Sequence, residues 1–421
     1  MNNNSEHFAL TLFFQERKYL WPEILQSIRS QLNYPASTDV WTVAAKNTWL
    51  ATMTLIQAYE HLKCVFPFPD AFPESDLQSV IKQLEKKYQK SVTCHHSISE
   101  LSLAVATSGS QEKFKIALIS RANILAHYKS FVRQVLLNRS SVWLNCMPLQ
   151  HIAGIMILYR CGLSQATMVL HEYFEARKVW FDLHHYAVSH ISLVPVMLSQ
   201  LLEIQLNSEH SQIPDSLKYV IVGGDRLAPA LHQQAISQGW PILLSYGMTE
   251  ATSTIALGKS ADKLMPLNGL ELSVSPDKTL RIRGDMVISA YVEGQWDSFE
   301  REWFKTTDLV SMTQGFLQVL GRKDDMIICG GENLSPVYLE SLFVKCPAIR
   351  DIAVTKIDNE QWGDSIAVLV KGDVGAFKSW LKNNIQSRYR PRLIIKVSEL
   401  PRNKSGKIDR RSIKTMIINT L

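Results

Sequence analysis

Two short polar segments carry side chains that could bind a nucleotide. Residues 246–250, Tyr-Gly-Met-Thr-Glu, follow an apolar run that predicts a strand, and open α/β sheets bind ligands at the carboxyl ends of their strands. A tyrosine can stack on a purine, a threonine can bond a phosphate, and the Glu250 carboxylate can hold Mg²⁺ against phosphate oxygens. Gly223, Gly224 and Asp225 end another predicted strand, where paired glycines let the backbone approach a flat ring. The alternative is two ordinary turns at strand ends.

A third segment offers hydroxyls, backbone amides and one flexible residue, which suit the phosphates of a nucleotide. It consists of Thr107, Ser108, Gly109 and Ser110, and Lys115 follows five residues later, where it could reach a phosphate. Taken alone, this segment is weak evidence, because such tetrapeptides are common in plain β-turns and a solvated lysine is the ordinary case.

Four charged residues lie in settings that suggest contacts with ribose or with an anion. Asp308 and Arg322 could bind ribose hydroxyls from two sides, although each alone is more typical of a solvated surface. Lys407 lies in a basic, glycine-bearing segment at residues 401–410, which could deliver a mobile lysine to an anion or could be a solvated tail. Arg160 interrupts an apolar run, where an unpaired charge is costly unless its long side chain reaches water.

The hydrophobic pattern predicts the elements that hold these residues, namely an α/β architecture with largely parallel sheets. Strand-like apolar runs alternate with longer amphipathic runs. From Leu280 the pattern changes to short strands and tight turns, and beyond Lys323 a small α/β pattern of about one hundred residues follows. We therefore predict domains at residues 1–322 and 323–421. The predicted strands include residues 9–14, 40–45, 141–144, 189–194, 218–222, 241–244, 315–320, 351–355 and 365–370, and the predicted helices include residues 19–32, 48–62 and 376–387.

Composition narrows the class of protein. The 421 residues are too many for one simple core, and 46% of them are hydrophobic, as in globular enzymes. The excess of 45 Lys and Arg over 39 Asp and Glu fits an anionic ligand, but no basic run is dense enough for nucleic acid. The most apolar stretch, residues 152–159, is too short to span a membrane, and the N-terminus lacks a signal-peptide pattern. Six scattered cysteines without a CxxC pair predict free thiols and a cytoplasmic protein: Cys64, Cys94, Cys146, Cys161, Cys329 and Cys346.

The order of the motifs is more specific than any one of them. The Ser/Thr/Gly loop, then GGD, YGMTE, TTD, GRKDDMIICGGEN and PRNKSGK resemble the adenylate-forming superfamily of acyl-CoA synthetases, peptide-synthetase adenylation domains and luciferases. The resemblance runs from about Ala9 to Lys414. It implies a large N-terminal adenylation domain of stacked, mostly parallel sheets with a small barrel-like subdomain, followed by a small mobile α+β lid domain. It also implies ATP, Mg²⁺, coenzyme A and a carboxylic acid as ligands.

The same resemblance implies a role for each motif. Lys407 would bridge the acid carboxylate and the α-phosphate, where the displacement concentrates negative charge that an ammonium stabilises. Thr249 would contact the α-phosphate, Glu250 would hold Mg²⁺, and Asp324 would be the hinge. After the hinge rotates Lys407 away, coenzyme A would attack the acyl-adenylate, with residues 329–333 lining the pantetheine path. The residues implied to bind ATP are Thr107, Ser108, Gly109, Ser110, Lys115, Gly223, Gly224, Asp225, Tyr246, Gly247, Asp308 and Arg322.

Within the superfamily, the chain looks most like the o-succinylbenzoate–CoA ligases of menaquinone biosynthesis. This likeness implies that His151, with a catalytic role, and Thr254 line the acid pocket, and that Arg160 holds the succinyl carboxylate that is not activated. The alternatives are a ligase for another acyl or aryl acid, an enzyme that loads a carrier protein, and a non-catalytic nucleotide-binding relative. The sequence leaves a monomer and a homodimer open. The segments that carry this likeness are residues 190–195, 247–254 and 330–333.

The phosphate loop departs from the family pattern, which is a Ser/Thr/Gly-rich loop ending in Gly-x-Pro-Lys. Here Gln111, Glu112 and Phe114 differ from that pattern. Glu112 would place a negative charge near the β- and γ-phosphates, and the loss of glycine removes easy access to positive φ. Because this loop mainly orients the departing pyrophosphate, we predict a working loop with a raised KM for ATP.

Overall fold

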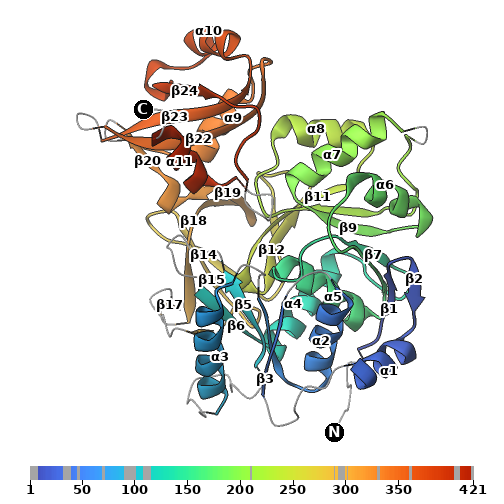
Figure 1. Ribbon diagram of the computed structural model, residues 1–421. Coiled ribbons are helices and arrows are strands. Elements are labelled where there is room, and N and C mark those ends of the chain that lie inside the picture. The colour runs from blue at the N-terminus through green and yellow to red at the C-terminus, as the bar shows by residue number, and fades with distance from the viewer. Residues whose placement is uncertain are drawn as a thin grey trace.

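The computed structural model places a large N-terminal body beneath a smaller C-terminal lobe (Figure 1). Among the residues that it describes, three sheets lie in the body and one lies in the lobe. The described residues are 8–31, 39–44, 48–68, 72–89, 101–107, 115–208, 211–288, 290–292, 299–300, 302–329, 332–359, 363–402 and 408–418.

The largest sheet has nine strands and a mostly parallel centre. In spatial order they are β13 (Met265–Pro266), β12 (Ser253–Gly258), β11 (Ile242–Met248), β10 (Tyr219–Val222), β9 (His190–Leu193), β7 (Val142–Asn145), β8 (Thr167–Leu170), β1 (Thr11–Phe14) and β2 (Arg17–Tyr19). The pairs from β1 to β11 are parallel, whereas β2, β12 and β13 pair antiparallel at the two edges. Its helices are α5 (Ile152–Ser164), α6 (Ala176–His185), α7 (Pro195–Leu206) and α8 (Pro229–Ser237).

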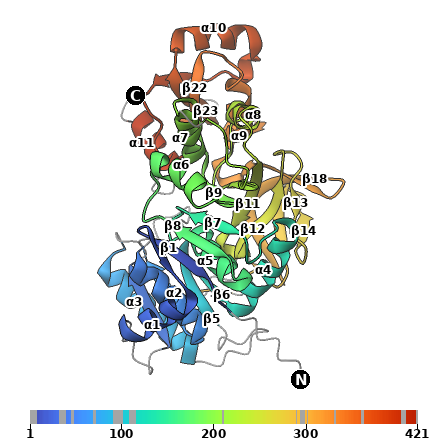
Figure 2. The ribbon, with the colours of Figure 1, turned by 90° about the vertical axis from the view of Figure 1, so that its right-hand side faces the viewer.

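A second sheet of five strands packs beside the first (Figure 2). Its order is β16 (Ala290–Tyr291), β6 (Lys115–Ser120), β5 (Leu101–Thr107), β4 (Cys64–Phe68) and β3 (Val40–Ala44). Helix α4 (Arg121–Gln134) contacts strands of both sheets, β6 and β12, and begins with a capping box between Ser120 and Asn123. The other helices of this half are α1 (Trp21–Gln31), α2 (Trp49–Glu60) and α3 (Glu74–Gln89).

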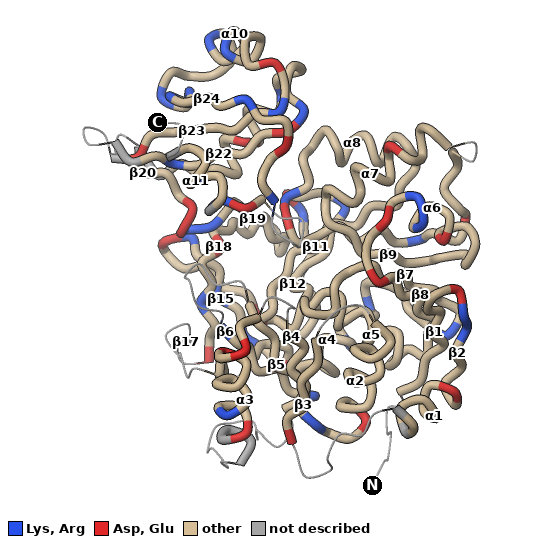
Figure 3. The backbone as a smooth tube through the Cα atoms, viewed as in Figure 1, with Lys and Arg blue, Asp and Glu red and all other residues tan. Residues whose placement is uncertain are grey.

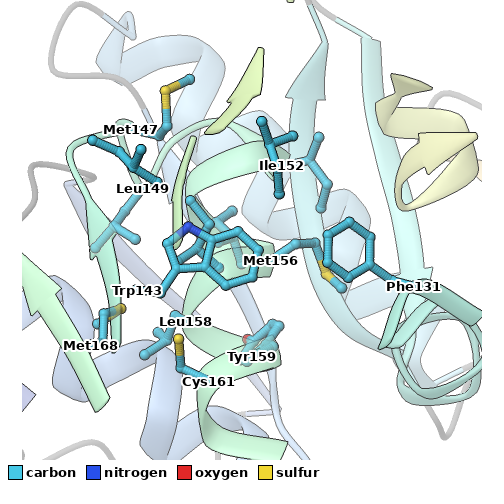
Figure 4. Close-up of a cluster of buried hydrophobic side chains, with 14 of the residues drawn as sticks. Phe131, Trp143, Met147, Leu149, Ile152, Met156, Leu158, Tyr159, Cys161 and Met168 are labelled. Carbon is cyan, nitrogen blue, oxygen red and sulfur yellow. The ribbon is translucent and has the colours of Figure 1, made fainter. Parts of the chain in front are cut away.

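Helix α5 lies in the main core, since every residue in it except Ala153 is buried. A Cβ at Gly162 would come within 2.0 Å of the Phe8 ring, so only glycine fits there. The Trp143 indole lies among these apolar side chains (Figure 4) and is fully buried. The apolar run around α5 is therefore core, and no helix in the described parts of the chain is long and apolar enough to cross a membrane.

The remaining sheets form a barrel-like subdomain and the C-terminal lobe, and the lobe has its own apolar core. The subdomain strands pair antiparallel and are β14 (Glu271–Val274), β15 (Thr279–Arg283), β17 (Phe299–Glu300), β18 (Trp303–Thr313) and β19 (Phe316–Arg322). The lobe contains β20 (Ile327–Cys329), β21 (Glu332–Leu334), β22 (Ile349–Asn359), β23 (Gly363–Gly372), β24 (Leu393–Lys396), α9 (Pro336–Phe343), α10 (Val374–Asn384) and α11 (Arg410–Ile418).

The predicted α/β fold class is confirmed, and one local expectation needs correction. The strand expected at residues 241–244 does not end there, because β11 continues to Met248. This extension pairs antiparallel with β12, with an irregularity between Tyr246 and Gly247. The tyrosine and glycine of the YGMTE segment are thus strand residues, and only the Thr-Glu pair begins the short 3₁₀ turn η2 (Thr249–Ala251).

Candidate active site

The predicted adenine and ribose residues come together at the junction of the main sheet and the barrel-like subdomain. The Tyr246 hydroxyl donates to Asp308 Oδ2 at 2.5 Å, and Asp308 faces Arg322 across the β18–β19 pair. Arg322 Nε lies 3.9 Å from Asp308 Oδ1, and its Nη2 donates to Thr307 Oγ1 at 2.7 Å. Three residues chosen separately from the sequence therefore form one connected group.

Burial sets the ionisation of this group. It raises the pKa of Asp308, while the Tyr246 hydroxyl and Arg322 act in the opposite direction. Burial, followed by the Asp308 carboxylate, raises the pKa of Tyr246. Tyr246 is therefore a neutral hydrogen-bond donor around neutral pH, and it holds the Asp308 carboxylate at a fixed position.

The Gly-Gly-Asp segment lies directly beside β11. A Cβ at Gly223 would be 3.0 Å from the Ser245 carbonyl oxygen, and Gly224 has φ of +81°, a conformation that glycine adopts readily. The Asp225 carboxylate accepts the backbone N–H of Arg226 at 2.7 Å and that of Ile408 at 3.0 Å. Asp225 thus links the large body to the C-terminal lobe.

Charged residues of both signs lie near Asp225 where the body meets the lobe (Figure 3), and one of them joins the two parts. The Arg226 guanidinium donates to the Val337 carbonyl of α9. Arg410 lies 3.2 Å from Glu340 and 3.4 Å from Asp325 in the 3₁₀ turn η3 (Lys323–Asp325), which also contains Asp324. The segment after Lys407 is therefore anchored at the Gly-Gly-Asp turn.

Glu250 and Lys115 approach the same tyrosine. The Tyr291 hydroxyl donates to Glu250 Oε1 at 2.7 Å, and Lys115 Nζ lies 5.5 Å from the centre of the Tyr291 ring. Lys115 begins β6, and its carbonyl accepts a hydrogen bond from Thr107 Oγ1 at 3.2 Å. Glu250 Oε2 has no hydrogen-bond partner among the described residues, so one carboxylate oxygen remains for a cation.

The single carboxylate of Glu250 fits a Mg²⁺ ion whose other ligands come mainly from a nucleotide. In the described residues no three His, Cys, Asp or Glu side chains gather into a metal site. Mg²⁺ in phosphate-transfer sites commonly takes one or two carboxylates and fills its other positions with phosphate oxygens and water. A single carboxylate with one open oxygen meets that requirement.

The backbone after Glu250 adopts an uncommon conformation. Thr252 has φ of +58° and Ser253 has φ of +136°, although neither is glycine. The Thr252 hydroxyl donates to the Met286 carbonyl at 2.7 Å, which holds the turn. At Gly247 a Cβ would be 2.0 Å from the Ser253 carbonyl oxygen, so the two strands approach too closely for a side chain. Such backbone conformations are concentrated at functional sites.

Arg160 is a buried cation without a carboxylate partner among the described residues. Its side chain is on α5 and the residue is 3% exposed, so its guanidinium does not reach water. The guanidinium carbon lies 3.7 Å from the centre of the Phe131 ring. The oxygen acceptors of Nη2 lie at long hydrogen-bond distances, Ser253 Oγ at 3.3 Å and Thr254 Oγ1 at 3.4 Å. Nε has no hydrogen-bond partner in the described part of the chain. Burial lowers the pKa of Arg160 to about 9.

His127, which the sequence did not indicate, lies next to Arg160. Its Nε2 accepts the Thr254 backbone N–H at 3.0 Å and is 3.5 Å from Arg160 Nη2. Burial and the positive charge of Arg160 lower its pKa, so the ring is neutral and its proton lies on Nδ1. Nδ1 has no partner among the described residues. Hydrogen-bond donors thus outnumber acceptors around Arg160, which favours an anion there.

The predicted roles of several residues are not tested by the contacts that the structure describes. Thr249 begins η2, and His151 is the N-cap residue of α5, half-buried, with no hydrogen bond from its side chain to the helix end. The roles assigned to these two residues stay predictions. The following residues lie outside the described part of the chain: Ser108, Gly109, Ser110, Gln111, Glu112, Phe114 and Lys407.

Two models of known protein families match the chain. The model of the AMP-binding enzyme family matches residues 44–284, and the model of the C-terminal domain of AMP-binding enzymes matches residues 338–407. The chain belongs to the AMP-binding enzyme family. Its similarity covers both the body, with the Tyr246 and Glu250 segments, and the lobe.

Curated relatives of this AMP-binding enzyme include 2-succinylbenzoate–CoA ligases. The ligase of Bacillus pumilus is 32% identical over 69% of this chain and 64% of its own length, so the match spans less than two thirds of that enzyme. The ligase of Listeria innocua is 30% identical over 75% of this chain and 70% of its own length.

Solved structures of other proteins share the fold. One is o-succinylbenzoate CoA synthetase (MenE) from Bacillus subtilis in complex with the acyl-adenylate intermediate OSB-AMP, with a TM-score of 0.81, 21% identity, and 98% of this chain and 96% of that chain covered. Another is ATP-bound MatB from Rhodopseudomonas palustris, with a TM-score of 0.84, 17% identity, and 100% and 97% covered. At these identities the likeness concerns the fold alone.

Proposed function

We propose that this AMP-binding enzyme is an acid–CoA ligase that converts 2-succinylbenzoate, ATP and coenzyme A into 2-succinylbenzoyl-CoA, AMP and diphosphate, a step of menaquinone biosynthesis. The observation that carries the choice of acid is the buried Arg160 guanidinium with no carboxylate partner among the described residues. A second carboxylate on the substrate would supply the missing negative charge. The names of the curated relatives support the same acid.

In the proposed first half-reaction, a carboxylate oxygen of the acid attacks the α-phosphorus of ATP. The bond to the diphosphate group breaks, and acyl-AMP and diphosphate form. Tyr246 and the Gly223–Asp225 turn would hold adenine, while Asp308 and Arg322 would hold the ribose. Mg²⁺ would neutralise charge on the phosphate oxygens, and Glu250 would hold it.

Lys407 would stabilise the charge that gathers between the acid carboxylate and the α-phosphate in this step. In the second half-reaction the coenzyme A thiolate attacks the acyl carbon, and AMP leaves with the electron pair of the acyl–oxygen bond. The lid domain, which we place at residues 323–421, would rotate about Asp324 between the two half-reactions. Residues 1–322 would form the adenylation domain.

The acid pocket would lie near Arg160, Thr254 and His151. A carboxylate beside Arg160 would take the donors that the described chain leaves unpaired, while the neighbouring aromatic rings would exclude water. Exclusion of water strengthens the pairing of guanidinium and carboxylate. A benzoate or fatty acid lacks the second carboxylate and would leave Arg160 buried and unpaired.

The proposal is tested by supplying the purified protein with ATP, Mg²⁺, coenzyme A and a panel of acids. Diphosphate release and acyl thioester formation are measured separately. We expect both with 2-succinylbenzoate and neither with benzoate or fatty acids. If the thioester forms only with a monocarboxylic acid, the protein is a ligase for another acid. If no acid supports ATP–diphosphate exchange, the result favours a nucleotide-binding relative that is not catalytic.

The proposed location is the cytoplasm, where ATP and coenzyme A are present. Four buried cysteines of the described chain carry free thiols, which fits a reducing compartment: Cys64, Cys146, Cys161 and Cys346. Light scattering at assay concentrations separates the homodimer from the monomer.

A further inference from the structure

Tyr291 lies where the phosphate-loop strand and the Glu250 turn meet. It belongs to β16, which pairs antiparallel with β6 so that Tyr291 faces Ala117. The residue is 3% exposed, and its hydroxyl crosses from the second sheet to Glu250 Oε1 at 2.7 Å. The Lys115 ammonium lies over the ring of the same side chain at 5.5 Å. One side chain therefore contacts both charged groups.

The segment that leads to Tyr291 is fixed at several points. The Ile288 N–H donates to the Glu250 carbonyl at 2.9 Å, and the Val292 N–H donates to the Ile116 carbonyl at 2.9 Å. The Asn123 amide at the start of α4 donates to the Asp285 carbonyl at 2.7 Å and to the Val287 carbonyl at 3.0 Å. These bonds hold residues 285–288 and 290–292 in place, so the Tyr291 hydroxyl has little freedom to follow Glu250 elsewhere.

We propose that Tyr291 is a positioning residue that aligns the Glu250 carboxylate and the Lys115 ammonium for Mg²⁺-nucleotide. This inference rests on the proposed function, because it takes ATP and Mg²⁺ as the ligands. The hydroxyl donates to Glu250 Oε1 and would hold the carboxylate in one orientation, which leaves Oε2 for a cation. The ring face supports the Lys115 ammonium, which would contact the phosphates.

The hydroxyl and the ring have separate tasks in this scheme. Partners that orient a metal ligand typically change metal affinity by about 10- to 100-fold when they are removed. Loss of the Tyr291 hydroxyl should therefore act on Mg²⁺, whereas loss of the ring should also act on the nucleotide itself through Lys115. If Tyr291 only fills the core, its loss would lower stability and weaken binding equally with and without Mg²⁺.

The test uses the full chain and measures binding of a non-hydrolysable ATP analogue by calorimetry, at a series of Mg²⁺ concentrations and in EDTA. In Tyr291→Phe we expect the Mg²⁺ concentration at half-saturation to rise about tenfold, with analogue affinity in EDTA unchanged within about twofold. In Tyr291→Leu we expect the same Mg²⁺ effect and also weaker binding in EDTA. The melting temperature of each variant is measured alongside.

Tyr128→Phe is the control, because it also removes one tyrosine hydroxyl, in this case from a half-buried residue. Tyr128 is on α4, and its hydroxyl donates to the Leu163 carbonyl of α5 at 3.1 Å rather than to Glu250. The control should keep the wild-type Mg²⁺ dependence. An unchanged Mg²⁺ dependence in Tyr291→Phe, or an equal loss with and without Mg²⁺, overturns the role of Tyr291. A wild-type protein that binds no ATP analogue refutes the proposed function instead.

Discussion

Replacing Arg160 with methionine should stabilise the ligand-free protein while removing its preference for a dicarboxylate. Methionine keeps the length and the apolar stem of the side chain but removes the buried charge. Burial lowers the pKa of Arg160 to about 9, and each pKa unit corresponds to about 1.4 kcal/mol. Keeping the guanidinium charged in the ligand-free fold therefore costs roughly 5 kcal/mol near neutral pH.

The contacts of Arg160 offset part of this cost. The guanidinium lies 3.7 Å from the centre of the Phe131 ring, and a desolvated contact of this kind contributes about 2 kcal/mol. Its hydrogen bonds to Ser253 and Thr254 are long, at 3.3 and 3.4 Å, so we assign them about 1 kcal/mol together. The substitution should then raise the free energy of unfolding by about 2 kcal/mol, within the range seen when buried charges are replaced by apolar side chains.

The pH dependence has a definite sign. Because the pKa of this base is lower in the folded state than in the unfolded chain, the cost is fully present below about pH 9 and declines as the pH rises further. The stabilisation by Arg160→Met should therefore be constant between about pH 6 and pH 8, and smaller above about pH 9. Urea unfolding at several pH values measures it.

Although Arg160→Met should stabilise the ligand-free protein, it should lower kcat/KM for 2-succinylbenzoate. A substrate carboxylate left buried without its cation loses about 3–5 kcal/mol, so kcat/KM for 2-succinylbenzoate should fall by roughly 150- to 5,000-fold. The analogue whose distal carboxylate is a primary amide should lose less than about threefold, since it never pairs with Arg160. The ratio of the two kcat/KM values is the decisive readout.

Arg121→Met is the matched control for Arg160→Met. Arg121 Nη1 donates to the Tyr59 carbonyl at 2.7 Å, so its loss should destabilise the fold by about 1–2 kcal/mol and leave acid selectivity unchanged. The reasoning about Arg160 is refuted if Arg160→Met lowers kcat/KM equally for both acids. It is also refuted if Arg160→Met destabilises the ligand-free protein as Arg121→Met does.

Three further predictions concern the nucleotide and the lid. Glu112→Gly should lower the KM for ATP in steady-state kinetics, since it removes a negative charge near the phosphates; an unchanged or higher KM would show that this departure is neutral or compensated. Asp225→Ala removes the acceptor of the Ile408 N–H, so ATP–diphosphate exchange at saturating ATP should fall about three- to tenfold. Thioester formation from saturating acyl-adenylate, which the same turn would hold by its adenine, should fall less, and equal losses in both would contradict a role specific to adenylation. Burial raises the pKa of Asp308, so this acid takes up its proton at a higher pH than an ordinary aspartate, and ATP affinity should decrease as the pH is lowered. Asp308→Asn should bind ATP more weakly and flatten this dependence, and a pH profile unchanged in the variant would exclude Asp308 as its cause.

Much of the fold could be predicted because the alternation of apolar strands and amphipathic helices is local information. The strand expected at residues 218–222 matches β10 (Tyr219–Val222), and the one at residues 365–370 lies within β23. The end of β11 could not be predicted, because nothing in Ser-Tyr-Gly-Met has strand periodicity. Its extension depends on pairing with β12, where Gly247 allows a close approach to Ser253. That pairing is a tertiary effect, and a window of sequence does not contain it.

The candidate site shows the same division between local and long-range information. Arg160 could be selected from sequence because a charge inside an apolar run is anomalous by itself, and its burial excludes the alternative that it reaches water. His127 and Tyr291 carry no such local signal, since a lone histidine or tyrosine in an apolar element is ordinary core. The importance of His127 comes from its contacts with Arg160 and with Thr254, which is 127 residues away in sequence. That of Tyr291 comes from its contacts with Lys115 and with Glu250, which is 41 residues away. Residues that bind a ligand can thus be recognised by type and motif, whereas residues that orient them are recognised only once the sheets that carry them are packed together.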